Sequence, residues 1–365
     1  MNRATTDDEW RDLLSARFLE FADTECAGLP LYDRISRGAS GDPGFLELLL
    51  AAPPGQRRPV LLLAALHDLV LDQHDVPAAR WFPSVTGQPV PIGDPWPDVR
   101  ETALDHAARL TSVCATRCTQ TNEPNRSALW AVAVPWIAAD VDTPIALVEL
   151  GCSAGLNLRW DRVSVELDGH TIRHPGATPV VSTRSRHGRP PVERFPEIVA
   201  RVGVDTSPVD LTDPIARRWL LACVWPEQTD RLDRFDAAVA AYLTDPDPPS
   251  IVAGDALDEL ADIVDSLASD VHLVIYWSWF LTYVERSRRE ALDQFLDLIG
   301  QGRSLSVISA EASGISPRFV DPGRPGDRGL ETRTVVGVSR WRHGQRRDEV
   351  VARCHPHLQW IDWLA

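Results

Sequence analysis

The residues with the clearest chemical potential form a short turn at Glu149–Gly155, which reads Glu-Leu-Gly-Cys-Ser-Ala-Gly. The apolar run Ile145–Leu150 leads into it and is typical of a buried strand. Gly151 and Gly155 permit positive φ angles and allow a ligand to approach the backbone. The helix expected after the turn offers free N–H groups to electronegative ligand atoms. The pattern therefore predicts a ligand site at a strand end, although such a turn also occurs without a ligand.

The stretch from Leu147 to Gly155 resembles the first motif of class I methyltransferases. The resemblance implies that the turn binds S-adenosylmethionine, with Glu149 next to the positively charged end of the cofactor. Gly151, Ser153 and Gly155 are the other cofactor-binding candidates in the turn. The family usually has glycine at the position of Ser153, so the serine is a departure from its pattern.

The same residues also spell Gly-x-Ser-x-Gly, the nucleophile elbow of α/β-hydrolases. In that interpretation Ser153 is an acyl-transfer nucleophile, Asp255 is its acidic partner, and His343, His355 or His357 is the base. The position of the turn argues against it. An elbow normally follows several earlier strands, whereas this turn follows the first credible strand, and no oxyanion-loop sequence precedes it.

Two later segments, in the expected order, strengthen the methyltransferase resemblance. Arg201–Pro208 resembles the second-strand motif, and Asp205 is the candidate for the ribose hydroxyls because one carboxylate can accept from both. Ser250–Ala256 resembles the third-strand motif, with Asp255 beside the adenine amine. Each Asp also has an ordinary alternative, since Asp205 can open a turn and Asp255 can cap a helix.

Val271–Val284 resembles the fourth strand and contains Tyr-Trp-Ser-Trp-Phe at residues 276–280. Trp277 is the candidate to stack on adenine or to attract the sulfonium cation. Any one of these aromatic residues can equally belong to the core. The methyltransferase resemblance covers about residues 144–365, and its main departure is the long insert before Val199.

A second resemblance, to a bacterial family of unknown function, spans nearly the whole chain. It rests on Gln120–Glu123 with Arg126, on Ser153–Leu158 with Asp161, and on Trp225–Gln228. Glu123 and Arg126 are the substrate-side candidates, and Asn157 is a further cofactor-binding candidate. Glu123 or His67 is the candidate base if the methyl acceptor must lose a proton. Asn122 and Asn125 can be simple helix caps, and Glu227 has no evident structural task.

The order of the expected elements predicts an α/β protein with a helical N-terminal domain at residues 1–140 and a Rossmann-like domain at 141–365. From Pro144 onward, short apolar strands alternate with helical segments, which implies a mostly parallel sheet. Glu331–Trp341 and Glu349–Cys354 predict a closing antiparallel hairpin. The insert at about residues 163–195 is polar and rich in Pro and Arg, so we expect it to leave the sheet, with short strands of its own at Val163–Leu167 and Pro179–Ser182. Helices are expected at Asp7–Ala27, Phe45–Ala51, Val60–Asp72, Val99–Cys118 and Ser127–Ala139, and parallel strands at 145–150, 199–204, 250–253, 272–277 and 304–309.

Composition limits the classes of partner. The net charge of -15, from 37 basic and 52 acidic residues, disfavours nucleic acid and anionic membranes. No apolar run reaches the length of a membrane span, and the acidic N-terminus is unlike a signal peptide. The six scattered cysteines form no disulfide framework. A zinc site at Cys114 and Cys118, with further ligands from Cys354-His355-Pro356-His357, is an alternative to the expectation of no metal.

We therefore expect a cytoplasmic S-adenosylmethionine-dependent methyltransferase that acts on a small molecule, with no nucleic-acid or membrane partner. The alternatives are a serine hydrolase acting through Ser153 and a non-catalytic Rossmann-like protein that binds an adenosine ligand.

Overall fold

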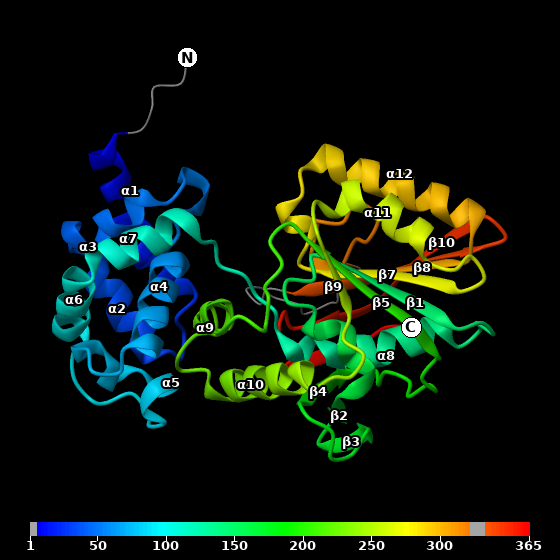
Figure 1. Cartoon of the computed structure of the whole chain (residues 1–365), viewed down its shortest axis with the longest axis horizontal. Helices are drawn as coiled ribbons and strands as arrows, with labels where there is room; N and C mark the ends of the chain where they lie inside the picture. Colours follow the sequence, from blue (N-terminus) through cyan, green and yellow to red (C-terminus); the bar gives the residue numbers. More distant parts are fainter. Residues whose placement is uncertain (1–5, 322–332) are drawn as a thin grey trace. The chain divides into compact units, whose positions relative to one another are not determined.

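In the computed structural model, which describes residues 6–321 and 333–365, the chain divides into two units (Figure 1). The first unit contains Met1–Thr121 and Asp210–Asp233, and the second contains Asn122–Val209 and Arg234–Ala365. The segment 210–233 thus belongs to the first unit, although its neighbours in sequence on both sides belong to the second. The chain is an α/β protein, as the sequence predicts.

The first unit is helical, and prolines mark where several of its helices begin. Pro occupies the first position of α2, α3, α4 and α9, where its missing N–H removes no helical hydrogen bond. Thr6 and Glu9 form a capping box at the start of α1. The helices are α1 (Asp7–Thr24), α2 (Pro30–Ser40), α3 (Pro43–Glu47), η1 (Leu48–Ala51), η2 (Pro54–Gln56), α4 (Pro59–Asp72), η3 (Pro77–Trp81), α5 (Pro83–Thr86), α6 (Trp96–Asp105), α7 (Ala107–Thr116) and α9 (Pro214–Ala222).

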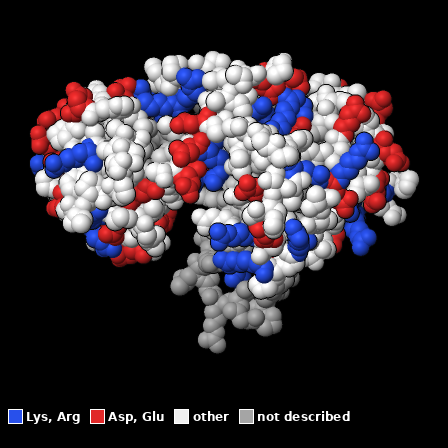
Figure 2. All heavy atoms as spheres, turned by 90° about the horizontal axis from the view of Figure 1, so that it is seen from below, with Lys and Arg blue, Asp and Glu red and all other residues white. Residues whose placement is uncertain are grey.

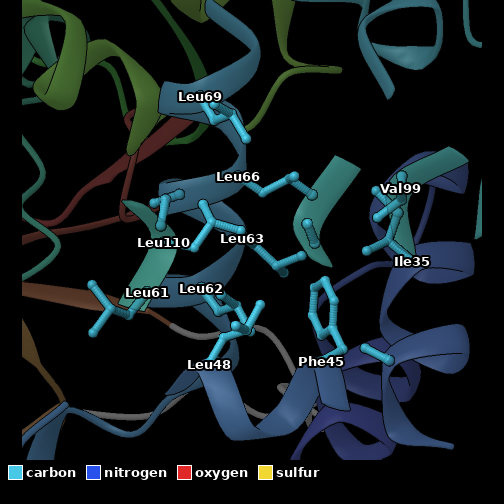
Figure 3. Packing of buried hydrophobic residues seen from close by; sticks show 14 of the residues in the cluster. Ile35, Phe45, Leu48, Leu61, Leu62, Leu63, Leu66, Leu69, Val99 and Leu110 are labelled. Carbon is cyan, nitrogen blue, oxygen red and sulfur yellow. The ribbon is translucent and has the colours of Figure 1, made fainter. Parts of the chain in front are cut away.

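Helix α4 is the centre of this unit because it is apolar on nearly every side. Five of its leucines are buried and pack against side chains from the surrounding helices (Figure 3). The expected buried helix at Val60–Asp72 is thus confirmed. The residues labelled in Figure 3 are Leu61, Leu62, Leu63, Leu66 and Leu69 of α4, with Ile35, Phe45, Leu48, Val99 and Leu110 around them.

Glu227, in the segment 210–233, forms hydrogen bonds with the start of α2. Its two carboxylate oxygens accept the N–H groups of Leu31, at 2.7 Å, and Tyr32, at 3.2 Å. These groups need an outside acceptor because the first N–H groups of a helix have none within it. Trp225 packs beside this cap against Phe21 and Tyr32. Glu227 therefore has a structural task that the sequence alone does not reveal.

The second unit is built on an 11-stranded sheet with the order β3-β2-β4-β11-β10-β9-β8-β7-β1-β5-β6. Its parallel half, β6-β5-β1-β7-β8, lies where the sequence predicts its five strands. The strands are β1 (Ile145–Leu150), β2 (Ser164–Leu167), β3 (His170–Arg173), β4 (Val180–His187), β5 (Ile198–Asp205), β6 (Ser250–Ala253), β7 (His272–Ser278), β8 (Leu305–Ala312), β9 (Thr334–Arg342), β10 (Gln345–Cys354) and β11 (Trp360–Trp363).

Helices cover both faces of this sheet. Helix α8 (Ser127–Ala138) packs on one face, and α11 (Ala256–Ser266) and α12 (Arg286–Gly302) lie together on the other (Figure 1). Helix α10 (Thr229–Leu243) follows α9 and begins at the boundary between the two units. The short helices are η4 (Pro124–Arg126), η5 (Leu156–Arg162) and η6 (Leu281–Tyr283).

The strand order reverses next to β1. The chain adds β5 and β6 on one side of β1 and then β7 and β8 on the other side. After β1, Leu158 and Trp160 join the core on the α8 face, whereas Leu281 after β7 joins the core under α11 and α12. The two connections therefore diverge from neighbouring strand ends. Open α/β sheets bind ligands at such a switch point, outside the carboxyl ends of the strands.

The insert at residues 163–195 does not leave the sheet, so that expectation is wrong. It forms β2, β3 and β4, and β4 pairs in parallel with β11 near the end of the chain, where Arg184 lies beside Trp360. Buried Val181 and Thr183 alternate with more exposed residues along β4. The two short strands expected in the insert are confirmed as β2 and the first part of β4, but the sequence did not predict that β4 continues to His187 and joins the sheet.

Other expected elements differ in detail. The helix expected at Val99–Cys118 is two helices, α6 and α7, separated at His106. Helix α2 was not expected, and it contains Gly38, where a Cβ would come within 2.2 Å of the Trp96 ring. The closing antiparallel hairpin is confirmed as β9 and β10. Residues 331–332 of its expected first strand lie outside the described residues.

On the face drawn in Figure 2, acidic and basic side chains are interspersed, and neither sign covers a broad continuous area. Within residues 6–321 and 333–365, no helix has both the length and the apolar character needed to cross a membrane.

Replacing Glu227 with Ala tests its capping role. We expect the free energy of unfolding to fall by about 1–2 kcal/mol, because two N–H groups at the start of α2 lose their acceptor. Denaturant unfolding measures the change. Glu101→Ala, at an exposed position of α6, is the matched control and should change stability by less than about 0.5 kcal/mol. Equal stability of the two variants would contradict the role.

Candidate functional site

The candidate site lies at the carboxyl ends of β1, β5, β7 and β8 in the second unit. The strand register places Leu150 beside Val204 on one side and beside Trp277 on the other, and Trp277 beside Ser309. The four strands therefore end at one level of the sheet. Polar side chains from these ends and from the segment 122–126 line this edge.

The glycine turn adopts the backbone conformation that its sequence predicts. Gly151 and Gly155 have φ values of 70° and 73°, and Ser153 also lies in the left-handed region with φ 54°. A regular α-helix does not follow, so that expectation is wrong: η5 is a 3-10 segment with a kink at Arg159. A Cβ on Gly151 would come within 2.8 Å of the Phe280 ring, so Phe280 packs directly on the turn.

Four N–H groups of the turn, and that of the next residue, already have acceptors within the protein. They are Gly151 and Cys152 to the Val204 oxygen (2.8 and 3.2 Å), Ser153 to Asp205 Oδ2 (2.9 Å), Gly155 to the Cys152 oxygen (2.8 Å), and Leu156 to Asn122 Oδ1 (3.1 Å). A phosphate cradle needs several such groups free. This turn is therefore poorly suited to a phosphate-bearing ligand, and its polar groups serve to hold its shape.

Asp205 lies beside the turn at the end of β5. Its Oδ2 accepts from Ser153 N, and its Oδ1 accepts from Ser207 N, both at 2.9 Å. The side chain is half-buried. Because a carboxylate has about four acceptor positions, Asp205 can still accept from a ligand hydroxyl while it holds the turn.

Asp255 and Trp277 have structural surroundings. Asp255 caps α11 by accepting from Leu257 N at 2.9 Å, and it pairs with Arg288 at 2.7 Å. Trp277 is buried in the core under α11 and α12 and lines a cavity there with Leu292 and Phe319. The ordinary alternative for Asp255, a helix cap, is thus present in the structure.

The segment 122–126 crosses the carboxyl edge of the sheet and is fixed by its amide side chains. Asn122 accepts from Leu156 N, as described above, and Asn125 bonds to both backbone groups of Ser182 and to the oxygen of His357. Asn157, a cofactor-binding candidate, instead accepts from Ser127 Oγ at 3.0 Å. The asparagines therefore position the segment on the edge.

Glu123 and Arg126 are carried by this fixed segment, and both are buried. Glu123 accepts from Asn125 N at 3.1 Å, and its carboxylate lies 3.7 Å from Arg234 and 4.0 Å from His357. Arg126 donates from Nε to the oxygen of Pro356 at 3.1 Å.

Glu149 is a buried carboxyl group near the end of β1. Its side chain is 4% exposed, and Oε2 has no hydrogen-bond partner in the described part of the chain. Burial raises the pKa of Glu149 well above its usual value; the Arg126 guanidinium lowers it and Asp205 raises it further. A buried carboxylate that lacks a donor is stabilised by an incoming positive charge.

Glu311, near the end of β8, is a second buried carboxylate, and the sequence analysis missed it. Its Oε1 accepts from Phe280 N at 2.8 Å and Leu281 N at 2.7 Å, while Oε2 has no partner among the described residues. Burial raises the pKa of Glu311 to about 7, against the lowering effects of these two N–H groups and of Arg126 and Arg289. A signal was present, since an acid follows an apolar strand here just as it does at Glu149.

The other candidates for chemistry lie elsewhere. His67 is buried in the helical unit, 3.0 Å from the Ala222 oxygen and 2.7 Å from Ser84 Oγ, and burial lowers its pKa to about 4. His343 lies in the β9–β10 turn, at the edge of the sheet opposite to Ser153, because β9 runs antiparallel to β8. Cys114 is buried, and the described residues contain no group of three or more His, Cys, Asp or Glu suited to a metal ion.

These features define an α/β protein with a doubly wound sheet and a polar, carboxylate-containing site at its switch point. The chain belongs to the bacterial family described as "Uncharacterized protein conserved in bacteria (DUF2332)", whose model matches residues 15–363. The expected resemblance to a bacterial family over nearly the whole chain is thus confirmed. A comparison with the curated proteins found no match. The family description names no activity, so function must be argued from the site.

Replacing Glu311 with Gln tests whether the buried carboxylate, once ionised, lowers the free energy of unfolding. Because the pKa of Glu311 is higher in the folded chain than its ordinary value of 4.5, its folded form binds the proton more tightly. Its contribution to stability is complete below about pH 4.5 and is lost as the pH rises through about 7. Over this pH range, the free energy of unfolding of Glu311→Gln should therefore fall by about 3 kcal/mol less than that of the unmodified protein.

Denaturant unfolding at several pH values from 4.5 to 8 measures the effect. Glu349→Gln, at an exposed position of β10, is the matched control and should keep the original pH profile. If Glu311→Gln and the unmodified protein lose stability equally over this range, the burial argument is wrong.

Proposed function

We propose that this protein binds S-adenosylmethionine at the carboxyl ends of β1 and β5 and transfers its methyl group to a small molecule. The observation that carries the proposal is Glu149, a buried carboxylate with an unpartnered oxygen beside a glycine turn at the switch point. S-adenosylmethionine is positively charged at its sulfonium and ammonium groups, and the charge it brings suits this carboxylate.

The turn supports the same class of ligand. Four of its N–H groups, and that of Leu156 after it, are used within the protein, which disfavours dinucleotides that need a phosphate cradle. S-adenosylmethionine has no phosphate. Its ribose hydroxyls are suited to Asp205, which keeps acceptor capacity next to the turn.

The cofactor supplies an electrophilic methyl group, so the protein contributes mainly by positioning. Glu149 would hold the cationic end, and Asp205 the ribose. Glu123 and Arg126 would lie on the substrate side, on a segment fixed by Asn122 and Asn125. Ser153 would act through the turn, which it helps to shape, whereas the Asn157 side chain is bonded to Ser127.

Calorimetric titration with S-adenosylmethionine tests the proposal. We expect Glu149→Gln to weaken binding about 10- to 100-fold, because a charge-assisted contact worth about 1.5–3 kcal/mol is lost. We also expect the unmodified protein to release protons on binding, since burial raises the pKa of Glu149 in the empty site and a bound cation would lower it. Titrations in buffers with different ionisation enthalpies measure this release, which Glu149→Gln should reduce.

Three comparisons sharpen this experiment. Asp205→Asn should also weaken binding, and NAD should bind far more weakly than S-adenosylmethionine. Glu349→Gln is the control for charge removal far from the site. No binding of S-adenosylmethionine by the folded, unmodified protein would sink the proposal. Binding without methyl transfer would favour the non-catalytic adenosine-binding alternative.

The left-handed backbone at Ser153 is the one observation that favours the serine hydrolase alternative, since nucleophile elbows are strained turns. The surroundings disfavour it: Asp255 is engaged by Leu257 N and Arg288, and His343 lies at the opposite edge of the sheet. His355 and His357 follow β10 at the same edge as Ser153, but β9, β8 and β7 separate β10 from β1.

We therefore expect a fluorophosphonate probe to leave Ser153 unlabelled. Mass spectrometry of the intact protein, with a known serine hydrolase as positive control, makes the measurement. Stoichiometric labelling that Ser153→Ala abolishes would establish the hydrolase instead.

A further inference from the structure

The proposed function uses Glu149, one of the two buried carboxylates at the edge of the sheet, and it gives no role to Glu311. Its side chain is 1% exposed, and Oε2 lacks a partner in the part of the chain that the structure describes. A buried polar atom without a partner costs free energy of about 1–3 kcal/mol. Glu311 therefore needs an explanation of its own.

The carboxylate of Glu311 is held in one orientation. Phe280 N and Leu281 N donate to Oε1 from the loop that follows β7. Phe280 in turn packs on Gly151 of the glycine turn. A group fixed from one side in this way has its second oxygen available for a ligand, without a loss of side-chain freedom on binding.

Glu149 and Glu311 belong to opposite sides of the strand ends. Side chains alternate between faces along a strand. Leu147 of β1 joins the core on the α8 face, which places Glu149 on that side, and Val307 of β8 joins the core under α12, which places Glu311 on the other. Arg126 acts electrostatically on both carboxylates. The strand ends thus carry two separate buried carboxyl groups on opposite faces of the sheet, and the proposed function uses Glu149 alone.

The charged groups that act on Glu311 are Arg126 from η4 and Arg289 from α12. Arg126 donates from Nε to the Pro356 oxygen, and Arg289 donates to the oxygens of Val284 and Ile315. Neither donates to Oε2. A bound molecule that carries an N–H or O–H donor would satisfy Oε2 when Glu311 is ionised.

A protonated amine meets this need better than the other common methyl acceptors. It brings both an N–H donor and a positive charge, whereas an alcohol or a thiol brings a donor alone. A carboxylate acceptor brings neither and would be repelled. Burial raises the pKa of Glu311 to about 7, which is the range in which a carboxylate exchanges protons efficiently at neutral pH.

We propose that Glu311 Oε2 binds the ammonium group of the substrate and accepts its proton, so that the methyl acceptor is an amine. In this step an N–H bond of the ammonium group breaks, an O–H bond forms on Glu311, and the nitrogen keeps the electron pair as a neutral amine. Only this neutral form has the lone pair that a methyl donor requires. The inference rests on the proposed function, because it assumes the methyl donor.

The test uses S-adenosylmethionine with a deuterated methyl group, incubated with the protein and an aqueous extract of small metabolites. Mass spectrometry with fragmentation identifies the labelled product and the atom that carries the label. We expect the label on nitrogen with the unmodified protein. Glu311→Gln should lower the rate by about 10²- to 10⁴-fold, while Glu349→Gln, at the exposed position used above, should leave it unchanged.

Binding gives a readout that does not depend on turnover. Glu311→Gln keeps an oxygen for Phe280 N and Leu281 N, so it should bind S-adenosylhomocysteine within threefold of the unmodified protein. The precursor amine, titrated calorimetrically into protein saturated with S-adenosylhomocysteine, should bind at least 10-fold more weakly to Glu311→Gln.

The outcomes separate the two claims. If the unmodified protein does not bind S-adenosylmethionine, the proposed function itself fails. If it binds but the label appears on oxygen, sulfur or carbon, or on no product, the amine inference is overturned. It is also overturned if Glu311→Gln transfers methyl groups within threefold of the unmodified rate.

Discussion

The site depends on one topological constraint, the reversal of strand order next to β1. Parallel strands need crossover connections, and these cover whichever face of the sheet they pass over. The connection after β1 joins the α8 face and the one after β7 joins the α12 face, so neighbouring strands send their chains in opposite directions. Glu149 therefore lies at the switch point, which is where open α/β sheets bind their ligands.

An open edge creates a second constraint, because irregular backbone near a core must find hydrogen-bond partners. Asn122 and Asn125 meet this demand by bonding to Leu156 N and to the backbone of Ser182 and His357. These polar residues in the segment 122–126 are thus explained by structure. Glu149 and Glu311 are not, because each keeps a buried oxygen without a donor among the described residues. The backbone groups at this edge thus have hydrogen-bond partners, whereas the two buried carboxyl groups lower the stability of the fold. This pattern is expected at sites where a protein loses stability in order to bind a ligand.

The features that could be predicted from the sequence are those that depend on residues close together in the chain. The five parallel strands are short apolar runs between turn signals, so local pattern suffices, and the glycine turn carries its conformation in Gly151 and Gly155. The pairing of β4 with β11 joins Arg184 to Trp360, and no local signal announces a contact between residues so far apart. Glu227 capping α2 is a similar long-range contact. Glu311 differs, because its strand was predicted, and only its resemblance to the end of β1 was overlooked.

Ser153 has two interpretations from the sequence, as part of a cofactor-binding turn and as an acyl-transfer nucleophile, and the geometry of the turn bears on both. A left-handed conformation at a residue other than glycine costs of order 1–3 kcal/mol, so something must maintain it. Here the conformation directs Ser153 N toward Asp205, and the Ser153 oxygen accepts from Val209 N at 3.2 Å. Both contacts join the turn after β1 to the chain at and after the end of β5. The strained turn thus fixes the spacing between Glu149 and Asp205, the two carboxylates that the proposed ligand needs, and this structural task accounts for the strain without requiring a nucleophile.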